Sequence, residues 1–210
     1  KCTFRGLIAG TYGVEVVVPG GYEISPRQIG SDGSIDSDIF SNGKSQTIAL
    51  AAGDTNLDFD AGLYQQASIS NFVWEDKNAN GIQDSGEPGI PGVRVALYQG
   101  GVEVNFDITD GNGTYSFTNL IPGTYTIGVD ATGYVVTTKG SGTATDSDID
   151  PTTGKTAGIT LISGQNNLDI DAGLYKLAAI GDFVREDTNG NGQQDSGELG
   201  LDQVVVNLYK

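Results

Sequence analysis

The chain contains no histidine and no methionine, and it has one cysteine and one tryptophan among 210 residues. Without histidine, the side chain that most often carries protons at neutral pH is missing. The lone thiol, Cys2, has no disulfide partner in the chain, so something other than a disulfide must hold the loops. We therefore expect no enzyme, and we expect Cys2 to be a small buried side chain on a strand.

Basic residues are also scarce, because 11 Lys and Arg stand against 27 Asp and Glu, which gives a net charge of −16. A basic face is what displaces counterions from phosphates, so we expect no nucleic-acid partner. The sequence has no apolar run long enough for a membrane span, no signal peptide and no lipidation motif, so we expect no membrane insertion here. An acidic surface suits divalent cations and an extracellular, secreted or cell-surface location.

The apolar residues alternate in short runs that Gly, Asn and Asp interrupt about every ten residues, and no helical periodicity is visible. Such a pattern is typical of an all-β sandwich. For the central part of the chain it predicts strands at residues 70–74, 92–98, 102–108, 114–118, 123–130, 134–138, 156–162 and 168–175.

An internal repeat divides the chain. LDFDAGLY at 57–64 returns as LDIDAGLY at 168–175, and a period of this length is that of a domain rather than of a solenoid rung. We predict tandem Greek-key β-sandwich domains: the C-terminal part of a first repeat in residues 1–64, a complete repeat in 67–175, and the N-terminal part of a third in 178–210. The short junctions should hold neighbouring repeats close together.

The segment DKNANGIQDSGE at 76–87 has the spacing of a twelve-residue calcium loop. A hard cation needs six to eight oxygens, so the chain must curl tightly, and Gly81 permits the sharp turn at position six. The predicted ligands are the side chains at positions 1, 3, 5, 9 and 12 and one backbone carbonyl at position 7, namely Asp76, Asn78, Asn80, Asp84, Glu87 and Ile82.

The same spacing returns in DTNGNGQQDSGE at 187–198, with the same offset as the LDFDAGLY motif. Its predicted ligands are Asp187, Asn189, Asn191, Asp195 and Glu198, with the carbonyl of Gln193. The alternative is a plain turn rich in Asn, Asp and Gly, but a turn has no need of acids at positions 9 and 12. Neither loop lies between helices, so Ca²⁺ is expected to staple a loop rather than to switch a sensor.

A second candidate metal site combines Asp146 and Asp148 with Asp171, which lies on the last predicted strand. Clustered acids repel one another unless a cation lies among them. The alternative is an ordinary solvated loop beside a polar sheet face.

The motif N-F-V-W-E-D-x-N-x-N-G-x-Q-D-x-G-E-x-G-I-P-G-V-x-V at 71–95, with T-D-G-N-G-x-Y-x-F at 109–117 and D-A-G-L-Y at 171–175, resembles the SdrD B-type repeats of serine-aspartate surface adhesins. The resemblance implies a fold related to the collagen-adhesin B-type (Cna-B) sandwich, bound calcium, and a stalk in a secreted, often wall-attached protein. The third copy departs from the motif, because Arg185 replaces Trp74 and Leu201-Asp202-Gln203 replaces Ile-Pro-Gly.

These observations predict a calcium-stiffened structural spacer of an extracellular surface or fibre-forming protein. Its expected partners are neighbouring repeats, with self-association into fibres as a further expectation. The alternative function is an adhesive module that grips a host protein, matrix protein or glycan with its loops. A glycosidase-like pair of acids is formally open, but the acids already follow the calcium spacing.

Overall fold

A computed structural model describes residues 2–29, 35–141, 145–181 and 183–209 of the chain, so Lys1 and Lys210, the outer limits of the first and third predicted segments, lie outside the described residues. The chain divides into two compact units, residues 1–176 and 177–210, which are described separately. The described residues form strands, turns and loops but no helix, and hence no helix that could cross a membrane.

One sheet of the repeat at 67–175 contains four antiparallel strands in the order β11-β9-β6-β7. Glycines 100 and 101, both with positive φ, join β6 and β7 in the two-residue turn that suits a twisted hairpin. Neighbours in this sheet are often distant in sequence, as in Greek-key connections. The strands are β6 (Arg94–Gln99), β7 (Val102–Ile108), β9 (Gly123–Val129) and β11 (Ile159–Leu161).

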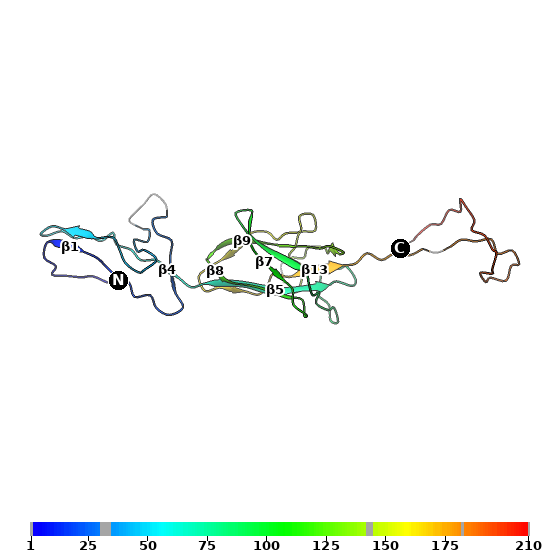
Figure 1. Ribbon diagram of the computed structural model, residues 1–210, viewed down its shortest axis with the longest axis horizontal. Coiled ribbons are helices and arrows are strands. Elements are labelled where there is room, and N and C mark those ends of the chain that lie inside the picture. The colour runs from blue at the N-terminus through cyan, green and yellow to red at the C-terminus, as the bar shows by residue number, and fades with distance from the viewer. Residues whose placement is uncertain (1, 30–34, 142–144, 182, 210) are drawn as a thin grey trace. The chain divides into compact units, whose positions relative to one another are not determined.

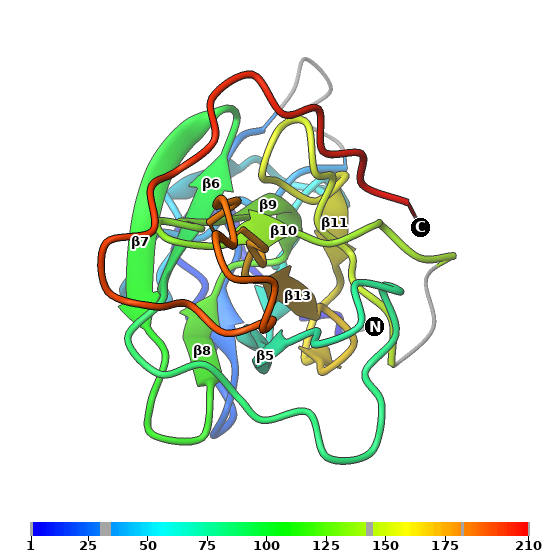
Figure 2. The same cartoon turned by 90° about the vertical axis from the view of Figure 1, so that its right-hand side faces the viewer.

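The second sheet is built on the long strand β5. Strands β12 and β13 run parallel to β5, strand β8 pairs with it antiparallel, and β10 pairs with β13. Figures 1 and 2 show this sheet facing the four-stranded one. The strands are β5 (Ala67–Glu75), β8 (Thr114–Leu120), β10 (Val135–Val136), β12 (Asn166–Asn167) and β13 (Ala172–Tyr175).

Both sheets contribute alternate side chains to one hydrophobic core. In β8, for example, Tyr115 and Phe117 are buried while Ser116 and Thr118 are exposed, which is the period-two pattern of a half-buried strand. The predicted all-β sandwich is therefore confirmed. The prediction made the strands corresponding to β10, β11 and β13 too long and missed β12, a two-residue strand of asparagines with no apolar alternation.

Residues 1–64 reproduce the second half of the complete repeat. Strand β1 (Gly10–Tyr12) pairs with β3 (Ile48–Leu50), and β2 (Glu23–Ile24) pairs with β4 (Leu63–Tyr64). Each pairing has the register of its counterpart, since Gly10 lies opposite Leu50 as Gly123 lies opposite Leu161.

This first segment leaves its apolar face open. Phe4 is 69% exposed, whereas its counterpart Phe117 is 1% exposed beneath the opposite sheet. The expectation that Cys2 is buried on a strand is wrong: Cys2 is exposed and in no strand, because no counterpart of β5 pairs with this segment.

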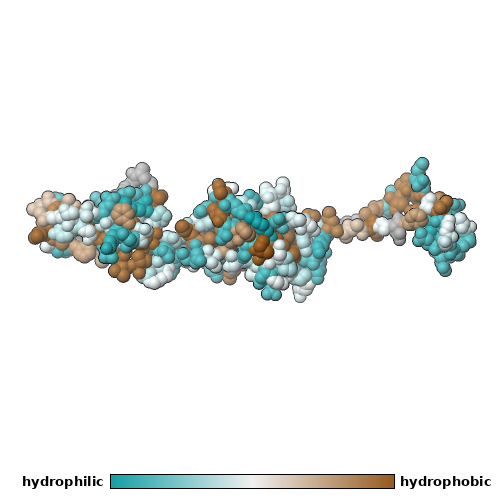
Figure 3. Space-filling view, in the orientation of Figure 1, coloured by the Kyte–Doolittle hydropathy of each residue, from teal (hydrophilic) through white to brown (hydrophobic). Residues whose placement is uncertain are grey.

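The unit 177–210 contains a closed loop but no strand among its described residues. A backbone bridge between Arg185 and Gly200 closes the loop, as the bridge between Trp74 and Gly89 does in the complete repeat. Ile180 is 85% exposed here, while its counterpart Ile69 is fully buried. Figure 3 shows apolar side chains at the surface of this unit and of residues 1–64.

Candidate metal centre

The loop at 76–87 begins directly after β5, and its first side chain is anchored inside the repeat. Asp76 is fully buried. Its carboxylate accepts the backbone N–H groups of Asn80 at 3.2 Å and Gly81 at 2.8 Å, and the hydroxyl of Thr137. Its own backbone N–H donates to the carbonyl of Leu174 on β13 at 2.9 Å. Strand β13, Thr137 and the backbone of the loop itself therefore all fix the first position of the loop.

The remaining predicted side-chain ligands meet inside the same loop. Asn78 Nδ2 and Asn80 Nδ2 donate to Asp84 Oδ2 at 2.8 and 2.9 Å. The Glu87 carboxylate accepts the backbone N–H groups of Lys77 at 2.8 Å and Asp84 at 3.0 Å. The three carboxylates and two amides named in the sequence prediction thus make hydrogen bonds within one short loop.

This donor set fits a hard cation chemically. Carboxylate and amide oxygens are the ligands that Ca²⁺ prefers. The two asparagines present Nδ2 to Asp84, while their Oδ1 atoms accept backbone N–H groups. Rotation of either amide would turn its oxygen toward Asp84, but it would also give up the backbone N–H group that this oxygen now accepts.

Gly81 and Ile82 lie against a distant segment of the chain. Gly81 O accepts the backbone N–H of Ser147 at 3.1 Å, and Ile82 forms a bridge with Asp146. A side chain at position 81 would place its Cβ 2.4 Å from the carbonyl oxygen of Thr138, and Gly81 has φ +81°. Glycine is therefore required at position 6 by both the turn and this close approach.

The loop at 187–198 repeats these bonds without the rest of the repeat around it. Asp187 accepts the N–H groups of Asn191 and Gly192 at 3.2 and 2.7 Å, and Asn189 and Asn191 both donate to Asp195 at 2.7 Å. The carboxylate at the twelfth position, Glu198, accepts two backbone N–H groups. Because the same bonds form in the short unit 177–210, the loop conformation depends mainly on local sequence.

The acids of the second candidate site are only partly brought together. Asp148 Oδ2 accepts the backbone N–H of Asp171 at 3.0 Å, and the backbone N–H of Asp148 donates to the carbonyl of Asp171 at 2.9 Å. Asp146 Oδ2 instead accepts the N–H of Ser141 at 2.8 Å. Within the described ranges, which include the loops at 76–87 and 187–198, no three acidic, cysteine or histidine side chains come together as a group that could hold a metal.

Asp171 is the most perturbed of these acids. It is buried, and its Oδ2 has no hydrogen-bond partner among the described residues. Burial, and then the neighbouring charge of Asp148, raise the pKa of Asp171 to about 7. Burial also raises the pKa of Asp148. An uncompensated pair of this kind favours a proton or a cation.

The pKa of Asp171 predicts how stability depends on pH in a chelator. The folded repeat keeps this proton up to about pH 7, whereas the unfolded chain releases it near pH 4. Stability from this group is therefore fully present below about pH 4 and falls as the pH rises to 7. Between pH 4 and pH 7, the free energy of unfolding of Asp171→Asn should therefore increase relative to that of wild type by on the order of 2–4 kcal/mol.

Urea unfolding between pH 4 and 8 measures that difference. Asp169→Asn is the comparison variant, because Asp169 is an exposed carboxylate two residues away. A constant difference between wild type and Asp171→Asn across this range would contradict the assignment.

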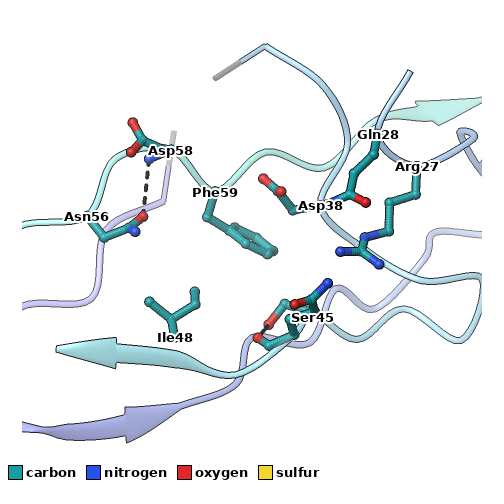
Figure 4. A pocket seen from close by; sticks show the side chains of 9 residues that line it. Arg27, Gln28, Asp38, Ser45, Ile48, Asn56, Asp58 and Phe59 are labelled. Atoms are coloured by element: carbon teal, nitrogen blue, oxygen red, sulfur yellow. Dashed lines mark hydrogen bonds between the residues drawn. The ribbon is translucent and has the colours of Figure 1, made fainter. Parts of the chain in front are cut away.

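A pocket of about 240 Å³ lies in the first segment. Figure 4 shows Phe59 and Ile48 beside Arg27 and Asp38 in it. Phe59 corresponds to Ile170, which packs against the core of the complete repeat. The pocket therefore includes a position whose counterpart in residues 67–175 packs against the core.

Comparisons with known proteins agree on one family. The model of the SdrD B-like domain matches residues 1–63 and 67–174. Serine-aspartate repeat-containing protein D of Staphylococcus aureus (strain Newman) is 40% identical over 205 residues, which cover 95% of this chain and 15% of that protein. Serine-aspartate repeat-containing protein F of Staphylococcus epidermidis is 38% identical over 213 residues, which cover 98% and 12%.

The chain therefore spans only a small part of the length of these relatives. Among solved structures, GBS52, the minor pilin of Streptococcus agalactiae, is 14% identical, with 77% of this chain and 84% of that chain covered and a TM-score of 0.38. A likeness at this level carries no argument about function.

Proposed function

Because the chain belongs to the family of SdrD B-like domains, we propose that it is a calcium-stabilised spacer within a large extracellular surface protein. One observation carries the proposal: two loops in different units form the same hydrogen bonds, in which two asparagine amides donate to the ninth-position aspartate and the first- and twelfth-position carboxylates accept backbone N–H groups. A plain turn would not need this set of oxygens twice.

In the first loop the ion would be held by Asp76, Asn78, Asn80, Asp84, Glu87 and the carbonyl of Ile82, and in the second by their counterparts in the loop at 187–198. Calcium supplies positive charge at the centre of an acidic loop and so stabilises only the folded form. Three carboxylates per loop suit an affinity near extracellular calcium, on the order of 10⁻³ M. We also propose a weaker second site at Asp148 and Asp171, with Asp146 as a further ligand.

The junction before the complete repeat supports a spacer role. Gln65 N donates to Ser163 Oγ at 2.8 Å, and Gly164 N donates to the carbonyl of Gln65 at 3.0 Å. Ser68 N donates to the carbonyl of Gln165 at 2.9 Å. The turn between β11 and β12 therefore holds the chain where it passes from β4 to β5, which limits bending at that junction.

The matched strand registers support the proposed division between residues 1–64 and 67–175, and the matched backbone bridge and loop bonds support 178–210 as part of a third repeat. The proposed partners are accordingly neighbouring repeats of the same protein. We propose no catalytic role. Self-association into fibres stays a prediction.

Thermal and urea unfolding with calcium and with chelator tests the proposal. Trp74, the single tryptophan, is buried in the complete repeat and reports on that repeat alone. Calcium at a hundredfold excess over Kd should raise the free energy of unfolding of the complete repeat by about 2.7 kcal/mol. Glu87→Gln should abolish most of this gain, because Glu87 would supply two oxygens.

Glu103→Gln removes an equally negative side chain outside the loop and should keep the whole calcium effect. Equal stability with calcium and with chelator in the wild type would remove the basis of the proposal. In that case the hydrogen bonds of the loop would hold the turn in place without a bound ion.

A further inference from the structure

The two loops differ at the glutamate of the twelfth position. In the second loop, Arg185 Nε donates to Glu198 Oε2 at 3.0 Å, and the two side chains are 22% and 2% exposed. In the first loop, the carboxylate of Glu87 accepts only backbone N–H groups among the described bonds. The difference has a sequence cause, since Arg185 stands where the first loop has Trp74.

Several contacts inside the loops are alike, although in the first loop Lys77 Nζ also donates to the carbonyl of Gly86 at 3.0 Å, where the second loop has Thr188. The first carboxylate of each loop accepts the N–H of the fifth position at 3.2 Å, and that of the glycine at 2.8 Å in one loop and 2.7 Å in the other. Both glutamates also accept the backbone N–H groups of the second and ninth loop positions. The loops thus offer the same ligands, but one of them carries an added cation on its closing ligand.

We infer that Arg185 lowers the calcium affinity of the second loop by competing for Glu198, so that the loop at 76–87 fills first. This inference rests on the proposed function. A guanidinium stays charged at any physiological pH, so the competition is permanent. A unit positive charge about 5–6 Å from a divalent ion in water weakens binding roughly tenfold.

A second factor acts in the same direction in the first loop. Thr137 donates to Asp76 and holds that carboxylate inside the repeat. A difference between the two loops in the wild type would therefore not isolate the arginine. Variants at Arg185 do isolate it, because they leave the first loop unchanged.

Calcium titration of the full chain by NMR measures each loop separately. The backbone amides of Gly81 and Gly192 serve as reporters, because each donates to the first carboxylate of its own loop, at 2.8 and 2.7 Å. In the wild type, the Gly192 resonance should reach its midpoint at higher calcium than the Gly81 resonance. Arg185→Gln should lower the Gly192 midpoint about tenfold and leave that of Gly81 unchanged.

Two further variants test whether charge is the cause. Arg185→Lys keeps the charge and should hold the Gly192 midpoint within about threefold of wild type. Arg94→Gln removes an arginine that pairs with Glu103 outside the loops, and it should move neither midpoint.

A normal response at Gly81 with an unchanged Gly192 midpoint in Arg185→Gln would overturn this inference and leave the proposed function standing. Absence of any calcium response at both glycines would overturn the two together.

Discussion

Replacing Asp76 with alanine should lower the free energy of unfolding of the complete repeat by about 3–5 kcal/mol, even in a chelator. Asp76 is fully buried, and its carboxylate accepts the hydroxyl of Thr137 and the N–H groups of Asn80 and Gly81. Alanine would leave buried donors without an acceptor and without water to replace it. Calcium should not restore the lost stability, because the first ligand of the loop is missing.

The control for this experiment is Asp187→Ala, the same change in the second loop. Asp187 is partly exposed and lies in the other unit, so the unfolding of the complete repeat should stay within about 0.5 kcal/mol of wild type. Urea unfolding followed by Trp74 fluorescence measures both variants. A loss below about 1 kcal/mol for Asp76→Ala would show that the sheet does not depend on this anchor.

Replacing Gly89 with alanine should lower stability by at least about 3 kcal/mol, because the new methyl group has no space. Its Cβ would lie 1.7 Å from the carbonyl oxygen of Asn112 and 2.8 Å from the ring of Phe72. The first obstacle is backbone, so a change of rotamer cannot relieve it. The facing segment is equally close, because a Cβ built on Gly113 would lie 2.7 Å from the Cα atom of Gly89. Two backbone segments therefore cross here with glycine on both.

Gly92→Ala provides the matched control three residues away. Gly92 has a positive φ of 78°, but a Cβ at this position would have no atom within 4 Å, so the variant should lose only about 1 kcal/mol. The same urea titration compares the two variants. If Gly89→Ala and Gly92→Ala lose similar amounts, backbone conformation rather than the crossing of segments sets the requirement for glycine.

The bends of the two acidic loops and the larger strands could be predicted because their causes are local. The spacing of Asp, Asn and Gly places acceptor oxygens where the N–H groups of a tight bend point, and the bend forms alike at 76–87 and at 187–198. Alternating side chains likewise predicted β7 with its observed bounds, Val102–Ile108. Agreement was best where a residue's partners lie close to it in the sequence.

The remaining features depend on residues far apart in the sequence. Thr137 lies 61 positions from Asp76, and no spacing rule connects them. Asp171 is buried directly before β13, which pairs with β5, and its Oδ2 has no hydrogen-bond partner among the described residues.

By itself, the sequence determined the class of fold, the domain-length repeat and the two acidic bends, because short-range alternation and turn chemistry specify each of them. Only the tertiary structure decided which acids become buried and which glycines have a neighbour at contact distance. The physical reason is that burial and desolvation depend on the segments that pack around a residue, and those segments come from elsewhere in the chain.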